Sequence, residues 1–127
     1  PELIADMNRI KFSYKPYNVN SLSQAAAVAA MEDENYFRDT VGKICATRAD
    51  TMTKLRERGF TGPDSATNFL FVTTSRMPCK QIFERLRQKG VLIRYFSAPR
   101  LSDYLRITIG TPEQMQRFFV LLFFFLG

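Results

Sequence analysis

A run of strand-forming residues from Asn68 to Thr73 is apolar on both of the faces that a strand presents. Successive side chains of a strand point to opposite faces, so this run needs cover on both sides. The pattern therefore predicts a buried strand rather than one at an open surface. The rest of the chain must supply the layers that bury it.

Helices are predicted before this strand. Three apolar residues near the start have helical spacing: Leu3, Ile4 and Met7. Pro16 forbids a continuous helix there, because it keeps Lys15 extended. Ser21 and Gln24 have the spacing of a capping box, with Ser21 at the cap, ahead of an alanine-rich helix. A longer helix is predicted over 33–58, with one apolar stripe (Phe37, Val41, Ile44, Arg48, Met52, Leu55) and Gly59 after it.

Helices and strands alternate after the buried strand. A helix over 78–89 is followed by a strand over 91–95, a loop over 97–102 and a strand over 104–109. The connection between these two strands is short enough for an antiparallel pair. A last helix begins at a Thr cap with proline behind it. The predicted order α-α-β-α-β-β-α is that of an α+β fold, a two-layer sandwich.

Composition excludes several kinds of chemistry. The 127 residues suffice for one domain, and histidine is absent, which removes Ser-His-Asp catalysis and histidine-ligated zinc within this chain. Cys45 and Cys79 form no C-x-x-C motif, so no metal site is expected. We expect both to be reduced, buried thiols of an intracellular protein. The apolar run from Phe118 to Leu126 is too short to span a membrane.

A basic charge balance, +6 at pH 7 and richer in arginine than in lysine, predicts anionic partners. Two arginines lie in predicted strands. Arg106 points away from the apolar face formed by Leu105, Ile107 and Ile109, and Arg94 ends the preceding strand. A charge in a central strand is costly unless it is paired or faces a ligand. Arg106 could instead be a solvated arginine of an edge strand or pair with a carboxylate, and Arg94 could be solvated, because strand ends are often wet.

A nucleic-acid role is weakly supported by the residues that begin at Lys89. They open like an RNA-recognition signature, but Val91 and Ile93 stand where bases would need aromatic rings. A stand-alone basic α+β module for an anionic ligand or RNA nevertheless remains the alternative hypothesis.

An ordered set of motifs resembles the histidinol-phosphate aminotransferases, fold-type-I enzymes that use pyridoxal 5′-phosphate in histidine biosynthesis. The set comprises Pro16-Tyr17-Asn18-Val19-Asn20, Gln24-Ala25-Ala26, Arg48, Asn68-Phe69, Gly90-Val91-Leu92-Ile93-Arg94 and Leu105-Arg106-Ile107-Thr108-Ile109-Gly110-Thr111. The resemblance covers the C-terminal third of that family. It implies that residues 1–127 are one small C-terminal domain, with 1–20 as the connection from a large domain outside this chain.

The resemblance also implies roles. In that family, the position of Arg106 receives the α-carboxylate of glutamate, and that of Arg94 helps to hold the phosphate of histidinol phosphate. The lysine bonded to the cofactor, and the groups that grip it, lie upstream in the family. No catalytic, cofactor-binding or metal-binding residue is therefore expected in this chain, which should be inactive alone. The expected parent is a cytoplasmic homodimer that acts on histidinol phosphate and glutamate or 2-oxoglutarate, with neither nucleic acid nor membrane as a partner.

Overall fold

The computed structural model describes residues 1–14 and 17–127. The predictions on Lys15 and Pro16 lie outside these residues. The chain divides into two compact units, Pro1–Arg38 and Asp39–Gly127. No described side chain of the first unit is buried, whereas the second unit contains a sheet and a hydrophobic core.

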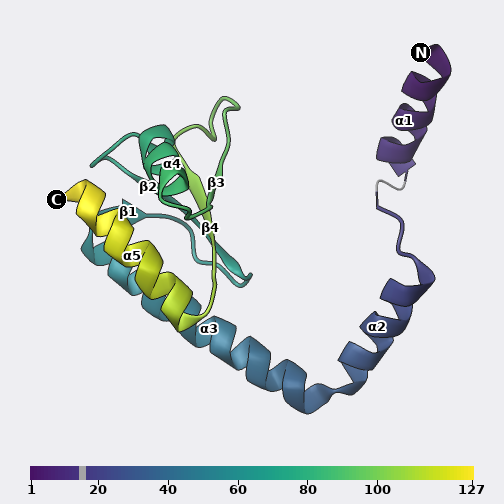
Figure 1. The fold of residues 1–127 in the computed structure, drawn as a ribbon, viewed down its shortest axis with the longest axis horizontal. Helices are drawn as coiled ribbons and strands as arrows, with labels where there is room; N and C mark the ends of the chain where they lie inside the picture. The colour runs from purple at the N-terminus through teal and green to yellow at the C-terminus, as the bar shows by residue number, and fades with distance from the viewer. Residues whose placement is uncertain (15–16) are drawn as a thin grey trace. The chain divides into compact units, whose positions relative to one another are not determined.

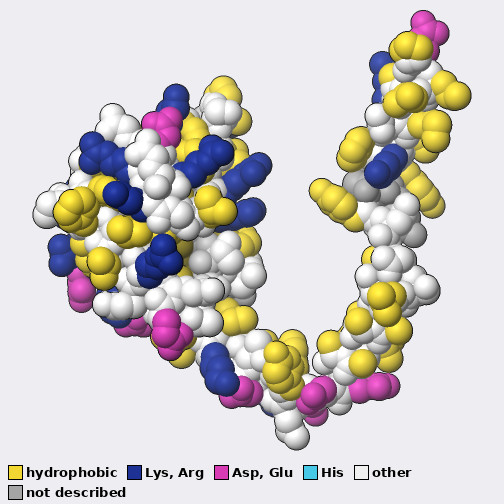
Figure 2. All heavy atoms as spheres, viewed as in Figure 1, with side chains coloured by type: hydrophobic (Ala, Val, Ile, Leu, Met, Phe, Trp, Pro, Cys, Tyr) yellow, Lys and Arg dark blue, Asp and Glu magenta, His cyan; other side chains and the backbone are white. Residues whose placement is uncertain are grey.

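The first unit carries helices whose apolar side chains are exposed. Helix α1 (Glu2–Tyr14) confirms the helical spacing near the start, and α2 (Ser21–Glu32) confirms the alanine-rich helix. The cap of α2 is Asn20, not Ser21 as predicted, because the Asn20 side chain accepts from the Ser23 backbone N–H at 2.8 Å. Figure 2 shows hydrophobic side chains in the open along these helices.

Helix α3 (Glu34–Glu57) begins in the first unit and continues through the second, and its predicted apolar stripe is buried only towards its end. Met52 and Leu55 are in the core, whereas Val41 is 40% exposed. Cys45 is exposed, so the expectation of two buried thiols is wrong for it. Cys45 lies in the part of α3 before its buried residues, Thr51, Met52 and Leu55, where most side chains are exposed.

A four-stranded antiparallel sheet lies in the second unit, in the order β1-β2-β4-β3. Its strands are β1 (Phe60–Thr61), β2 (Phe69–Thr74), β3 (Arg94–Tyr95) and β4 (Leu105–Thr108). The antiparallel pairing of the last two strands was predicted and is confirmed. The two-residue strand β1 was not predicted, since two residues are too few for a periodic pattern.

The predicted strand over 91–95 is wrong for its first three residues. Gly90 has a φ of 77°, and the Val91 N–H returns to the Leu86 carbonyl at 3.0 Å. This left-handed cap, which favours glycine, ties Val91 to the end of the preceding helix. The chain joins the sheet only at Arg94.

Helices α4 (Cys79–Gln88) and α5 (Pro112–Leu126) share one core with α3 and the sheet. Thr111 and Gln114 form a capping box at α5, as the sequence predicts. Five strand residues and four residues of α5 are buried there: Phe60, Leu70, Val72, Leu105, Ile107, Met115, Phe118, Phe119 and Leu122. The two-layer α+β fold is confirmed, with one helix and one short strand more than the predicted order contains.

Candidate anion-binding site

The alternation along β4 places Arg106 on the face of the sheet opposite the core. Leu105 and Ile107 are 1% and 2% exposed and belong to the core, while Arg106 between them is half-buried. This orientation was predicted from the sequence. Arg106 thus stands in the middle of a strand with its charge on the face of the sheet opposite the hydrophobic core.

The register of the sheet brings the two predicted arginines together. Arg94 of β3 lies directly opposite Arg106, and Phe71 of β2 lies opposite Arg106 on its other side. Like charges directly opposite each other in antiparallel strands are destabilising. An anion bound between the two guanidinium groups would remove this repulsion.

Aromatic rings line this face beside the arginines. The guanidinium carbon of Arg106 lies 5.3 Å from the ring centroid of Phe69 and 5.9 Å from that of Phe96. The guanidinium carbon of Arg94 also lies over the ring of Phe96, 5.4 Å from its centroid. These distances are within the range of cation–π attraction, so the rings hold the guanidinium groups without neutralising them.

Neither guanidinium has a carboxylate partner among the residues that the structure describes. The Nε atom of Arg106 is buried and has no hydrogen-bond partner there. A buried donor left without an acceptor is costly, since its hydration is lost with nothing in return. The sequence leaves open that Arg106 pairs with a carboxylate. No such pair occurs within residues 1–14 and 17–127.

The loop before β2 is tied down by hydrogen bonds. Arg48 of α3 donates to the Thr67 carbonyl at 2.6 Å, and the Ser65 hydroxyl donates to the Phe69 carbonyl at 2.6 Å. The Thr67 hydroxyl lies 3.2 Å from the same Phe69 carbonyl. These contacts fix the start of β2, where the ring of Phe69 meets Arg106.

The loop between β3 and β4 contains a strained turn. The Leu101 N–H bonds to the Ala98 carbonyl at 3.1 Å, with Pro99 and Arg100 as the central residues. Arg100 has a φ of 70°, a conformation that usually takes glycine at the third position of such a turn. The turn lies between Arg94 and Arg106 in the sequence and joins the strands that carry them.

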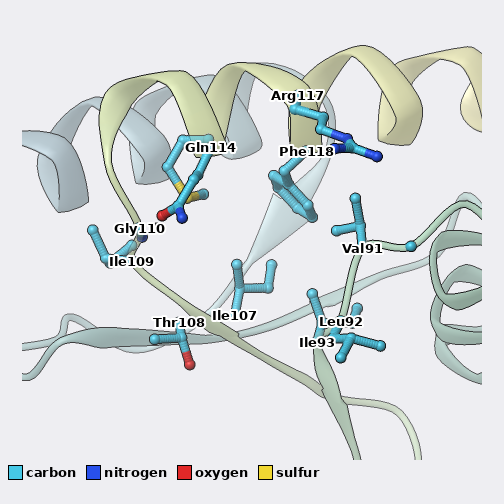
Figure 3. Close-up of a pocket in the computed structure, with 12 residues that line it drawn as sticks. Val91, Leu92, Ile93, Ile107, Thr108, Ile109, Gly110, Gln114, Arg117 and Phe118 are labelled. Atoms are coloured by element: carbon cyan, nitrogen blue, oxygen red, sulfur yellow. Dashed lines mark hydrogen bonds between the residues drawn. The ribbon is translucent and has the colours of Figure 1, made fainter.

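A cavity of about 450 Å³ lies elsewhere, where the segment before β3 diverges from the end of β4. Figure 3 shows Val91 and Ile93 on one side, Ile107 below and Phe118 above, with Arg117 at the rim. Neither Arg94 nor Arg106 lines this cavity. It belongs to the core side of the sheet, since Ile107 points into it, and it is separate from the arginine site.

The described residues contain no cluster of metal ligands, and the lysines of Asp39–Gly127 lie in helices or at a helix end rather than in the sheet. No cluster of three His, Cys, Asp or Glu side chains occurs in residues 1–14 and 17–127. Lys54 pairs with Asp50 at 2.7 Å and lies over the ring of Phe119, in the helical layer. Lys80 and Lys89 are exposed, in α4 and at its end.

Sequence reasoning missed the aromatic partners of the arginines. The alternation of β2 could have placed Phe69 and Phe71 on the face opposite Leu70, which is buried. The alternation does not predict the register of the strands. In the observed register Phe71 lies opposite Arg106, and Phe96 lies near both arginines.

Comparisons with known proteins show the family and the fold of this chain. Residues 4–121 match the model of the family "Aminotransferase class I and II", and the chain belongs to this family. Over 116 residues it is 40% identical to the histidinol-phosphate aminotransferase of Brachyspira hyodysenteriae, covering 91% of this chain and 33% of that protein. Over 117 residues it is 41% identical to that of Clostridium botulinum, covering 92% and 33%.

A solved structure has the same fold. The crystal structure of the histidinol-phosphate aminotransferase from Clostridium acetobutylicum superposes with a TM-score of 0.71 at 20% identity, covering 91% of this chain and 36% of that one. At this identity the likeness concerns the fold alone. The chain spans about a third of the length of the curated relatives it matches.

Proposed function

We propose that this chain is the small C-terminal domain of a histidinol-phosphate aminotransferase, with residues 1–20 as the connection from a large domain. The parent would transfer an amino group between histidinol phosphate and glutamate or 2-oxoglutarate. The family and the names of the relatives support this reaction. The observation that carries the site is the pair Arg94 and Arg106, directly opposite each other and without a carboxylate among the described residues.

In this proposal Arg106 receives the α-carboxylate of glutamate. A guanidinium group donates two parallel hydrogen bonds to a carboxylate, which fixes the orientation of the substrate as well as its position. The unpartnered Nε atom of Arg106 is a donor that such a ligand can use. Holding the reacting group in one orientation lowers the entropic part of the barrier to transfer.

Arg94 holds the phosphate of histidinol phosphate in the same proposal. Its position at the strand end leaves it exposed, so a large dianion can approach it. The charge of Arg106 across the ladder adds to the attraction for that dianion. The two arginines would thus bind the anionic groups and leave the bond changes to the rest of the enzyme.

The cofactor of the proposed parent is pyridoxal 5′-phosphate, which supplies an electron sink for amino transfer when it is bound. The lysines of Asp39–Gly127 do not fit it, because Lys43 and Lys54 lie in α3, Lys80 in α4 and Lys89 at its end, and none lies in the sheet that carries the arginines. We therefore propose that the cofactor-bonded lysine lies in the large domain. The chain alone should then be inactive.

The assembly and location of the parent are further parts of the proposal. A homodimer in the cytoplasm is what the family leads us to expect, with the large domain as the partner of this chain. Among residues 1–14 and 17–127, no helix combines the length and hydropathy needed to cross a membrane.

Kinetics of the parent enzyme test the role of Arg106. Arg106→Ala should raise the KM for glutamate and lower kcat/KM by at least about tenfold, roughly 1.4 kcal/mol. Arg117→Ala is the matched control, since Arg117 is exposed and lines the separate cavity. A smaller loss for Arg106→Ala than this, or an equal loss for both variants, would contradict the carboxylate role.

The 127-residue chain tests whether the cofactor-bonded lysine lies outside it. After incubation with pyridoxal 5′-phosphate, borohydride reduction and gel filtration, we expect no cofactor absorbance on the 127-residue protein. Stable labelling of one specific lysine would contradict the inactive role. Tight, salt-dependent binding of an RNA oligonucleotide would instead favour the alternative, a stand-alone basic module.

A further inference from the structure

We propose that Phe96 is a positioning residue that holds the guanidinium groups of both Arg94 and Arg106 in place for the anionic ligand, an inference that rests on the proposed function. Phe96 is the one described ring within cation–π distance of both groups, at 5.4 Å from Arg94 and 5.9 Å from Arg106. Two cations that repel each other are therefore attracted to the same ring.

The chemistry of a ring suits this task better than that of a carboxylate. A carboxylate would fix a guanidinium group through its N–H donors and would cancel its charge. A ring attracts the flat face of the group and leaves the N–H donors at its edge free. Arg106 is attracted in this way by two rings, Phe69 and Phe96, and its Nε donor is unused within the described residues.

Phe96 is itself held by neighbouring rings. It meets Phe71 edge to face, with ring centroids 6.4 Å apart, and Phe71 stacks on Tyr104 at 4.6 Å with the two planes 7° apart. Aromatic pairs in these geometries are attractive beyond the area that they bury. The ring that orients the arginines therefore has few orientations of its own, and less side-chain freedom remains to be lost when the ligand binds.

The experiment uses the 127-residue chain labelled with ¹⁵N, and follows the arginine side-chain signals as inorganic phosphate or glutarate is added. Phe96→Leu, which keeps an apolar side chain but removes the ring, should weaken both Kd values by about threefold to tenfold. Phe96→Tyr, which keeps the ring, should bind within about twofold of the wild type.

Phe83→Leu is the matched control. Phe83 of α4 also lies near an arginine, with its ring centroid 6.0 Å from the guanidinium carbon of Arg87, but it packs on Tyr95 and not on Arg94 or Arg106. Anion binding should be unchanged in this variant. Equal weakening in Phe83→Leu and Phe96→Leu would overturn the positioning role, because loss of packing would explain both.

A second measurement does not depend on how well Phe96→Leu folds. Phenylalanines with increasing ring fluorination, introduced at position 96 alone, lower the negative charge on the ring face at almost constant shape. Anion affinity should fall stepwise with fluorination if the ring acts through cation–π attraction. An affinity that is independent of fluorination would overturn the proposal.

Arg106→Gln separates this inference from the proposed function. If Arg106→Gln abolishes anion binding while Phe96→Leu and the fluorinated rings leave it unchanged, Phe96 has no positioning role and the anion site stands. If the wild-type chain binds neither anion, or Arg106→Gln binds as the wild type does, the anion site itself is wrong and the role of Phe96 falls with it.

Discussion

The two faces of the sheet in the second unit differ in what their side chains do. On one face Leu105 and Ile107 of β4 are almost fully buried among helical side chains. On the other, Arg106 of the same strand stands beside Arg94 and the phenylalanine rings. The pleat separates them completely, because neighbouring side chains of a strand point to opposite sides.

One short strand can therefore contribute to stability through one face and to ligand recognition through the other. The core face gains free energy by removing apolar area from water. The arginine face keeps charge and a buried donor without a partner, which is unfavourable until an anion arrives. A shift of one residue in the register of β4 would exchange the two faces and abolish both properties.

The largest expected effect comes from breaking the core face. Leu105→Ala removes a side chain that is 1% exposed, and it should lower the free energy of unfolding by about 2 to 5 kcal/mol. Urea denaturation followed by circular dichroism measures this loss. Leu92→Ala, at a side chain that is 78% exposed, is the control. Equal stability of the two variants would mean that Leu105 is not a core residue.

Substitution on the arginine face should have the opposite effect, a large loss of anion binding with little change in the free energy of unfolding. Arg106→Gln should weaken glutarate binding to the chain by at least about tenfold, roughly 1.4 kcal/mol. It should change the free energy of unfolding by less than about 1 kcal/mol, because repulsion from Arg94 is lost together with the ring contacts. Isothermal titration calorimetry measures the Kd for the anion, and urea denaturation measures the free energy of unfolding. A variant that loses stability and binding in parallel would contradict the separation of the faces.

A smaller effect is expected at the strained turn between β3 and β4. Arg100→Gly should raise the free energy of unfolding by about 0.5 kcal/mol, since glycine adopts a φ of 70° without steric cost but loses more freedom on folding. Ser97→Gly, in the same loop, should not stabilise the chain. Thermal unfolding of both variants measures the difference, and a destabilised Arg100→Gly would indicate that the arginine side chain contributes to the folded loop.

The smallest effect concerns the pH dependence of the core side. Burial raises the pKa of the Cys79 thiol, helped by the carboxylate of Asp103, and the thiol donates to the Asp103 carbonyl at 3.0 Å. The protonated thiol is favoured in the folded state. Its contribution is complete below the ordinary thiol pKa and is lost as the pH rises through the raised value.

Cys79→Ala should therefore flatten the alkaline loss of stability, measured as urea midpoints from neutral pH upwards. Cys45→Ala, which removes an exposed thiol, is the control and should leave the slope unchanged. The same alkaline slope in the wild type and in Cys79→Ala would contradict the assignment.

Local signals predicted much of the fold. The Thr111 cap and the orientation of Arg106 follow from residues within a few positions of each other. Where a local signal was ambiguous, the prediction was inaccurate. Ser21 and Asn20 are both good caps, and the structure uses Asn20, while Val91 has strand propensity but is held by a helix end.

Helical and strand periodicity are local properties, so the sequence predicts an α+β domain and the orientation of Arg106 away from the core. The prediction that the strand from Asn68 is buried on both faces was wrong, because Phe69 and Phe71 of β2 are only partly buried. Local patterns do not predict that Arg94 lies opposite Arg106 or that Phe96 contacts both. Register and ring contacts depend on how distant segments pack together. The fit of the core as a whole fixes that packing, and no single segment encodes it.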